Sequence, residues 1–214
     1  MPIRSIPRRR LIVGAAVGVA AAPRLVRAAI MPPTPAQTEG PFYPLRLPDD
    51  RDADLVRVTG SDARALGVVT HVVGRVLSPD GRPFPGVLVE IWQCDAHGRY
   101  RHPRERGTAA LDPGFQGYGQ TLTDASGAYR FRTIRPVGYP GRTPHIHFRL
   151  GTPAGELLTT QMYVAGEPDN ERDAVLNAIR DPELRRRLLV ELNPADLIEP
   201  GALAGTFDIV LDAA

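Results

Sequence analysis

The chain has one cysteine, Cys94, and none of its 26 basic residues is a lysine. A single cysteine excludes an intramolecular disulfide and any zinc site built from several cysteines. No pattern of basic neighbours marks Cys94 as a nucleophile. We therefore interpret it as a small hydrophobic residue of the core.

Positive charge is scarce outside the N-terminal segment. Six arginines precede Ala29 with no acidic residue among them, and without that segment the formal net charge changes from +2 to about −4, because 20 arginines then face 24 acidic residues. The rest of the chain has no concentrated basic patch, so we expect no nucleic-acid partner.

The apolar run from Leu11 to Ala22 is shorter than the roughly 20 residues of a transmembrane helix. We therefore expect no stable membrane span. The run follows Arg8 and Arg9 in an arrangement that resembles a twin-arginine export signal, and Val26-Arg27-Ala28 could be its cleavage site. Residues 1–28 are predicted to be an export leader and the protein to be periplasmic or exported, the alternatives being an uncleaved anchor or a cytoplasmic protein with an N-terminal extension.

The composition favours a β-rich globular protein. The 22 prolines and 21 glycines imply many turns, while 43% hydrophobic and 23% charged residues are ordinary values for a folded domain. A length of 214 residues suits one catalytic domain. We place an extended N-terminal arm, rich in proline and charge, at 29–66 and the domain at 67–214.

From Val68 onward, strand-like runs alternate with turn clusters. The predicted strands are 68–77, 87–93, 120–123, 129–134, 145–150, 157–164 and 207–211. The turn Asp124-Ala125-Ser126-Gly127 predicts that the third and fourth of these form a hairpin. Helical spacing of apolar residues within 170–192 predicts one or two short helices over a sheet edge. Because strands and helices do not alternate regularly, the pattern indicates an all-β sandwich with short helical insertions.

Two histidines stand one residue apart in the predicted strand His145-Ile146-His147. Side chains two apart on a strand share a face, so both imidazoles project together while Ile146 points into the core. Tyr139 lies just upstream, and Tyr100 lies in a long loop between two strands. By itself a His-x-His pair is equally consistent with an ordinary strand. Two imidazoles with two phenolates would favour ferric iron, because phenolates are hard anionic ligands.

Motifs along most of the chain resemble the intradiol ring-cleaving dioxygenases. In order, they are Thr38-Glu39-Gly40-Pro41, 86–93, Gly98-Arg99-Tyr100-Arg101-His102, 112–117, Leu122-Thr123-Asp124, Phe131-Arg132-Thr133-Ile134, 138–148, Thr160-Gln161-Met162-Tyr163 and 207–211. Because the resemblance covers nearly all of the chain after the leader and keeps the motif order, it is specific.

The resemblance implies a non-haem Fe(III) enzyme that cleaves a catechol-type diol with O2 to a cis,cis-muconate-type diacid. By position, the metal ligands would be Tyr100, Tyr139, His145 and His147. Tyr139 would be the phenolate that the substrate displaces, and Arg142 the cation beside the reacting ring. Trp92 and Gln161 match positions of the substrate pocket. The oligomeric state stays open, with an oligomer among the outcomes.

One departure from the family concerns the span between Tyr139 and His145, which is shorter and lacks a tryptophan that helps to wall the ring pocket. The substrate, whether catechol, protocatechuate, hydroxyquinol or a larger aryl diol, therefore stays open. Two rival interpretations remain: an exported, non-catalytic β-sandwich binding module and a zinc hydrolase that uses His145 and His147. The second has no nearby Asp or Glu ligand motif.

Overall fold

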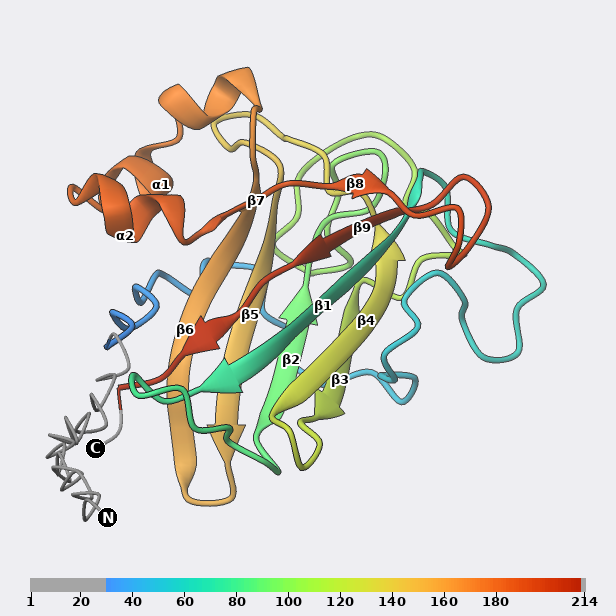
Figure 1. Cartoon of the computed structure of the whole chain (residues 1–214). Helices are drawn as coiled ribbons and strands as arrows, with labels where there is room; N and C mark the ends of the chain where they lie inside the picture. Colours follow the sequence, from blue (N-terminus) through green and yellow to red (C-terminus); the bar gives the residue numbers. More distant parts are fainter. Residues whose placement is uncertain (1–29, 213–214) are drawn as a thin grey trace, which may run out of the picture.

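The computed structural model describes residues 30–212, so the predicted export leader lies outside the described residues. Two five-stranded sheets pack face to face (Figure 1). The first contains β10 (Ile209–Val210), β1 (Val69–Leu77), β9 (Leu203–Thr206), β8 (Asn193–Pro194) and β4 (Ala128–Ile134), the last paired with β1. The second has the order β3 (Tyr118–Leu122), β2 (Leu88–Trp92), β5 (His145–Thr152), β6 (Gly155–Val164) and β7 (Leu189–Val190). The predicted all-β sandwich is confirmed.

Alternation along the strands builds the core between the sheets. On β5, Ile146, Phe148 and Leu150 are fully buried in the main hydrophobic cluster. The same cluster contains Val72 and Val76 of β1. His145 and His147 occupy the intervening positions of β5 and therefore project from the outer face of the second sheet. This period-2 pattern places both imidazoles on one side of one strand.

The hairpin predicted across 120–134 is wrong. The turn at 124–127 forms as expected, since the Asp124 carboxylate accepts bonds from the backbone amides of Ser126 and Ala128. However, β3 pairs with β2 and β4 pairs with β1, so the two strands belong to opposite sheets. A turn sequence reverses the chain locally, but it does not decide which strand each arm pairs with. The segment is a connection between the two sheets.

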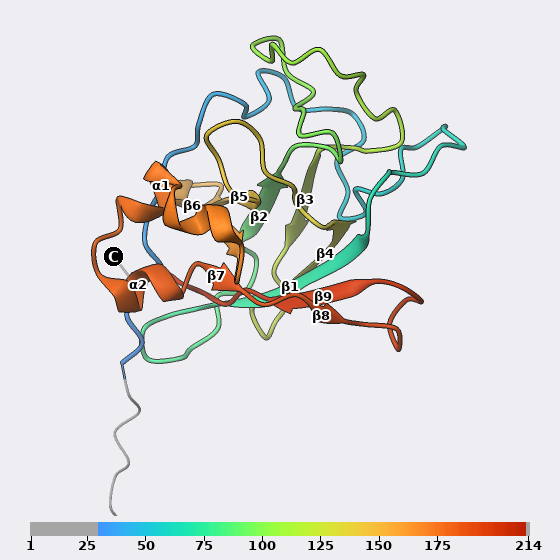
Figure 2. The ribbon, with the colours of Figure 1, turned by 90° about the horizontal axis from the view of Figure 1, so that it is seen from above.

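Short helices join β6 to β7 at one side of the sandwich (Figures 1 and 2). They are η1 (Pro168–Glu171), α1 (Ala174–Asn177) and α2 (Pro182–Arg186), as the helical spacing predicted. Asp173 caps α1 and Asp181 caps α2 through side-chain bonds to backbone amides. Within residues 30–212, no helix has the length and apolarity needed to cross a bilayer.

Residues 30–66 run over the sandwich without forming a helix or strand, and they are joined to it by isolated bridges and single backbone hydrogen bonds. The Thr34 amide bonds to the Val210 carbonyl at the end of the first sheet, and the Gln37 amide bonds to the Thr159 carbonyl of β6. Farther along, the Tyr43 hydroxyl donates to Glu90 of β2 at 2.7 Å. The arm therefore crosses the outer face of the second sheet, on the side where His145 and His147 project.

Candidate metal centre

His145 is held in a defined tautomer. Its Nδ1 lies 2.6 Å from the Thr143 carbonyl oxygen, which can only accept, so Nδ1 carries the proton and donates. The lone pair of Nε2 is then free to bind a metal. A backbone acceptor of this kind is the usual support of a metal-binding histidine.

His147 presents its Nε2 to the same point. The two Nε2 atoms lie 3.3 Å apart, and the Trp92 ring stacks on His147 with 4.7 Å between centroids and 8° between planes. On another side, a Cβ added to Gly40 would lie 3.4 Å from His147 Cε1. The imidazole therefore lies between the Trp92 side chain of β2 and the backbone of the arm at Gly40.

Tyr100 comes from the loop between β2 and β3. Its side chain is buried and its hydroxyl has no hydrogen-bond partner among the described residues. Phe42 of the arm stacks on the Tyr100 ring at 4.5 Å between centroids. Gly98 brings this loop against Tyr139, because a Cβ there would lie 3.4 Å from the Tyr139 Cβ. The two tyrosine rings meet edge to face, 5.7 Å apart.

Tyr139 and Arg142 are the ends of a tight turn. The Tyr139 amide bonds to the Arg142 carbonyl, and the Arg142 amide bonds back to the Tyr139 carbonyl. Pro140 and Gly141 fill the centre, and Gly141 has φ +83°, as the third position of a type II turn requires. The shortened span predicted from the sequence is thus a two-residue Pro-Gly turn that keeps Tyr139 beside Arg142.

The Arg142 side chain is fixed by three partners on two elements, the strand β6 and the N-terminal cap of α1. Its Nε donates to Asp173 at 2.9 Å, and its Nη2 donates to the Gln161 amide oxygen at 2.6 Å and to the Tyr163 hydroxyl at 3.4 Å. The Gln161 amide nitrogen donates to the Thr38 carbonyl of the arm. The guanidinium side chain is only 15% exposed, so its charge acts in a largely dehydrated environment.

Burial sets the protonation of the four candidate ligands. It lowers the pKa of His145 to about 4, with help from the positive charge of Arg142, and it lowers the pKa of His147 well below its usual range. Both imidazoles are therefore neutral near pH 7. Burial also raises the pKa of Tyr100 well above 10 and, with a partial offset by Arg142, raises that of Tyr139.

These residues fit a hard trivalent cation. Two neutral imidazole nitrogens face one point, and two phenol rings lie beside them, at 5.5 Å between the centroids of Tyr139 and His145 and 6.2 Å between those of Tyr100 and His147. Leaving a buried hydroxyl unpaired is costly, and a cation at Tyr100 would remove that cost. Within 30–212 no cluster of three His, Cys, Asp or Glu side chains could hold a metal. The candidate site is not such a cluster, because two of its four ligands are tyrosines.

The structure brings together the seven residues singled out from the sequence: Trp92, Tyr100, Tyr139, Arg142, His145, His147 and Gln161. Trp92 and Gln161 are almost completely buried and contact His147 and Arg142 respectively; whether they also touch substrate stays a prediction. Cys94 is buried as expected, and burial raises the pKa of its thiol to about 12.

Sequence reasoning missed four residues of this site: Gly40, Phe42, Tyr163 and Asp173. In the sequence Tyr163 stands only as the last residue of a family motif, yet its hydroxyl forms hydrogen bonds with Gln37, Gln161 and Arg142. The sequence around Asp173 carries the signal of a helix cap, but nothing in that signal points to Arg142. The arm motif was noted without any indication that it crosses the histidines.

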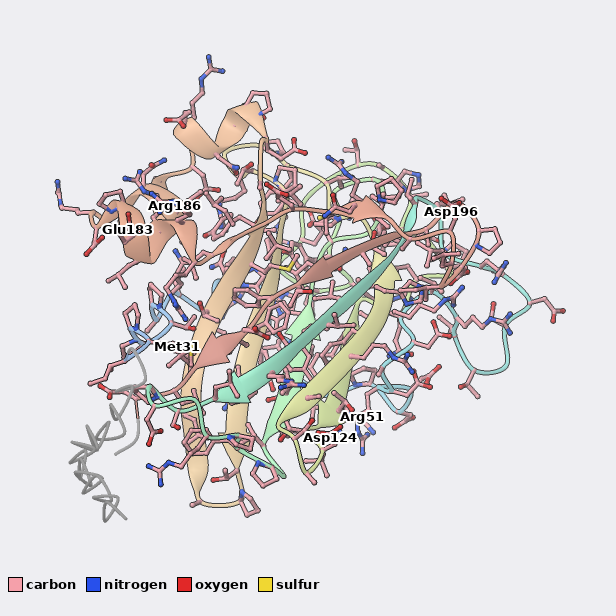
Figure 3. All side chains as sticks on the ribbon, viewed as in Figure 1. Met31, Arg51, Asp124, Glu183, Arg186 and Asp196 are labelled. Atoms are coloured by element: carbon pink, nitrogen blue, oxygen red, sulfur yellow. The ribbon has the colours of Figure 1, made fainter. Side chains whose placement is uncertain are left out.

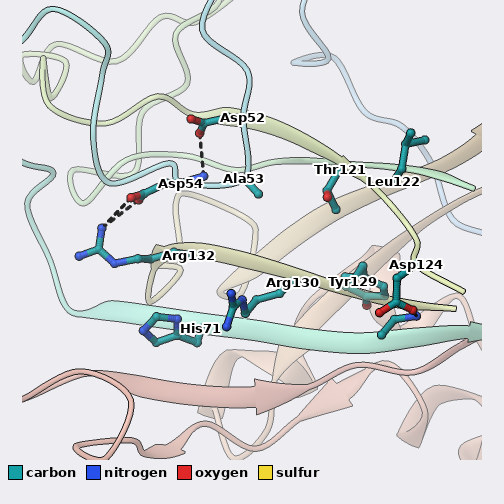
Figure 4. Close-up of a pocket in the computed structure, with 11 residues that line it drawn as sticks. Asp52, Ala53, Asp54, His71, Thr121, Leu122, Asp124, Tyr129, Arg130 and Arg132 are labelled. Carbon is teal, nitrogen blue, oxygen red and sulfur yellow. Dashed lines mark hydrogen bonds and ion pairs between the residues drawn. The ribbon is translucent and has the colours of Figure 1, made fainter. Parts of the chain in front are cut away.

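A cavity of about 710 Å³ opens beside the Pro-Gly turn, with Tyr139, Arg142, Arg135 and Arg172 in its lining. A second cavity, of about 770 Å³, lies elsewhere, between the edges of β3 and β4 (Figure 4). His71, Thr121, Arg130 and Arg132 line it, and it is separate from the four candidate ligands. Only the first cavity adjoins the candidate site.

Comparison with known proteins identifies the family of this chain. A family model described as "Dioxygenase" matches residues 38–213. The chain belongs to the intradiol ring-cleaving dioxygenase family. The protocatechuate 3,4-dioxygenase beta chain of Burkholderia cepacia is 43% identical over 169 residues, which are 75% of this chain and 71% of that protein. Catechol 1,2-dioxygenase 2 of Acinetobacter lwoffii is 32% identical over 179 residues, covering 72% and 62% of the two chains.

A solved structure also matches. It is the dioxygenase domain of a dioxygenase carbohydrate-binding protein fusion from Streptomyces sp. SirexAA-E, with a TM-score of 0.63 and 38% identity, and the match covers 86% of this chain and all of that one. Membership of this dioxygenase family favours an enzyme over a non-catalytic binding module. It also confirms the family resemblance found in the motifs.

Proposed function

We propose that this dioxygenase family member uses non-haem Fe(III) to cleave a catechol-type diol between its two hydroxyl-bearing carbons with O2, yielding a cis,cis-muconate-type diacid. The observation that carries the proposal is the meeting of two facing imidazole nitrogens, 3.3 Å apart, with a buried phenol that lacks a partner. Relatives named as protocatechuate and catechol dioxygenases support the substrate class.

Four residues would hold the iron. His145 and His147 supply neutral nitrogen donors, and Tyr100 supplies a phenolate from a loop packed under Phe42. Tyr139 supplies the second phenolate from the Pro-Gly turn, where it is less buried than Tyr100 and so is the ligand that a substrate can displace. When bound, ferric iron supplies a Lewis acid and electron acceptor that makes a catecholate reactive toward oxygen.

Arg142 would stabilise negative charge that develops on the ring. Its guanidinium is held on two sides, by Asp173 and Gln161, before any substrate arrives. A cation that is already oriented in a dehydrated pocket stabilises a transition state more strongly than one in water, because no reorganisation is needed at the moment of reaction. The pairing with Asp173 also keeps the pKa of Arg142 above its ordinary value despite burial.

The decisive experiment is metal analysis and a visible spectrum of the purified full chain, followed by oxygen uptake with catechol, protocatechuate and hydroxyquinol. We expect stoichiometric iron, a reddish phenolate-to-iron absorption band and oxygen uptake with at least one diol. A colourless protein that holds zinc and no iron would support the zinc hydrolase instead. If the protein binds no metal, the non-catalytic binding module would be the remaining interpretation.

We also propose that residues 1–28 direct export through a twin-arginine pathway, on the strength of Arg8, Arg9 and the apolar run that follows. Export of a folded protein suits a cofactor that is loaded in the cytoplasm. Changing Arg8 and Arg9 to lysine in the full chain should retain the protein in the cytoplasmic fraction. An unchanged periplasmic fraction would contradict the proposal.

A further inference from the structure

We infer that Asp173 is a positioning residue for catalysis, which fixes the guanidinium of Arg142 from the first turn of α1. Asp173 is not among the metal ligands and acts through Arg142. The inference rests on the proposed function, since it names a residue that the same site depends on. It assigns a catalytic purpose to the helical insertion between β6 and β7.

The Asp173 side chain is fully buried and both of its oxygens are used. Oδ1 accepts from the amides of Val175 and Leu176, each at 2.9 Å, and so caps α1. Oδ2 accepts from Arg142 Nε at 2.9 Å and from the Thr143 amide at 3.0 Å. One carboxylate therefore joins the helix to the chain segment that carries the active-site cation.

This contact fixes the plane of the guanidinium. Arg142 is bound at Nε by Asp173 and at Nη2 by Gln161, which are acceptors on different elements. A planar group held at two of its nitrogens cannot rotate about its long axis without losing one bond. The hydrogen bonds of Arg142 within residues 30–212 thus involve Nε and Nη2. With Oδ2 removed, the side chain would keep its charge but lose its orientation.

Asp173→Asn separates this role from helix capping. Asparagine caps helices about as well as aspartate, but its amide nitrogen cannot accept from Arg142 Nε and the Thr143 amide. In the iron-loaded enzyme we expect kcat to fall by roughly 10- to 100-fold, the range for a displaced catalytic group, with KM changed less than about twofold. Iron content and the visible band should stay as in the wild type. The serine hydroxyl of Asp173→Ser can cap the helix but is too short to reach Arg142, so this variant should show the same loss of kcat. It replaces Asp173→Asn in the test if the asparagine variant does not fold.

Asp181→Asn is the matched control. Asp181 caps α2 through the amides of Glu183 and Leu184 at 2.8 and 3.4 Å, the pattern seen at α1, but within residues 30–212 its carboxylate has no arginine side chain as a partner. Figure 3 shows Glu183 and Arg186 of this helix at the outside of the molecule, and both side chains are exposed. We expect its kcat and KM to equal those of the wild type.

A double-mutant cycle with Arg142→Gln makes the test decisive. If Asp173 acts through Arg142, Asp173→Asn adds no further loss of kcat in the Arg142→Gln background. The changes in the urea midpoint of the full chain, measured with a chelator present, should be non-additive in the same way. This second readout does not need activity. Wild-type kcat in Asp173→Asn, or losses that multiply in the double variant, would overturn the inference. Failure of the proposed function is distinguishable, because the wild type itself would then lack iron and turnover.

Discussion

At the scale of single residues, Tyr100 combines complete burial with a hydroxyl that has no partner among the described residues. Removing that hydroxyl should have opposite effects on folding and on metal binding. We expect Tyr100→Phe to raise the free energy of unfolding of the chelator-treated chain by about 1 kcal/mol, since a buried unpaired group is lost. Iron content and the visible band should fall, as absorption spectra and metal analysis would reveal.

Tyr129→Phe is the control for this prediction. The Tyr129 hydroxyl is also buried, but it donates to the Phe207 carbonyl. Its loss should lower stability by about 1 kcal/mol in urea unfolding and leave iron binding unchanged. An unaltered spectrum in Tyr100→Phe would remove Tyr100 from the ligand set.

Gly40 permits the arm to lie on His147. It has φ +73°, and an added methyl would lie 3.4 Å from Cε1 and 4.0 Å from Nε2 of the imidazole. Gly40→Ala should cost about 1–2 kcal/mol from the left-handed backbone and, because that strain falls on the segment that contacts a ligand ring, should speed iron loss to a chelator. Gly201 has the same φ of +73°, and a Cβ added there would have no neighbour within 4 Å. Gly201→Ala should therefore lose similar stability and keep its iron. Equal iron retention in the two variants would contradict the prediction.

At the scale of elements, an ion network ties β1, β4 and the loop before β9 to the arm, and Figure 4 shows its Arg132–Asp54 pair. Glu199 accepts from Arg132 Nε at 2.7 Å and lies 3.2 Å from His71 Nε2, while Arg132 Nη1 binds Asp54 at 2.9 Å. The hydrogen bond from Arg132, ahead of its charge, lowers the pKa of Glu199 from 4.5 to about 2. The network therefore contributes stability that depends on pH.

The direction of this pH dependence follows from the linkage between protonation and folding. A carboxyl whose pKa is lower in the folded state stabilises the fold fully above its unfolded pKa, near 4.5, and loses that contribution as pH falls toward about 2. Glu199→Gln should consequently be less stable than the wild type at pH 6, and the difference should shrink between pH 4.5 and pH 2. Urea titrations at several pH values measure it. A difference that stays constant with pH would show that Glu199 titrates normally.

At the scale of the whole molecule, the arm from 30 to 66 completes a site whose strand ligands, His145 and His147, lie far later in the chain. Phe42 stacks on Tyr100 and lies edge to face against Tyr139 and His102. Phe42→Ala should cost about 1–2 kcal/mol and weaken iron retention, measured as the rate of iron loss to a chelator. Leu45→Ala, a change in the same arm at a side chain 72% exposed, should do neither. Faster iron loss in both variants would point to a general loosening of the arm.

Much of this molecule was predictable because its signals are local. The period-2 alternation around His145 predicted both the strand and its outward face, and Pro140-Gly141 suits the turn that sets Tyr139 beside Arg142. Those signals need only a few neighbouring residues. The hairpin at 124–127 failed for the complementary reason: the turn is local, whereas the pairing of β3 with β2 and of β4 with β1 depends on which faces the two sheets bury.

The sequence by itself therefore determined the six longer strands β1 to β6, though not the short β7, β8 and β9, and it determined the side of β5 on which the histidines lie and, through its motifs, the dioxygenase family. Only the tertiary structure decided what surrounds them. It placed Gly40 against His147, left the Tyr100 hydroxyl without a partner, and joined Asp173 to Arg142 across thirty-one positions of chain. Such contacts arise when separate elements pack around a shared core, and no periodicity within one element encodes them.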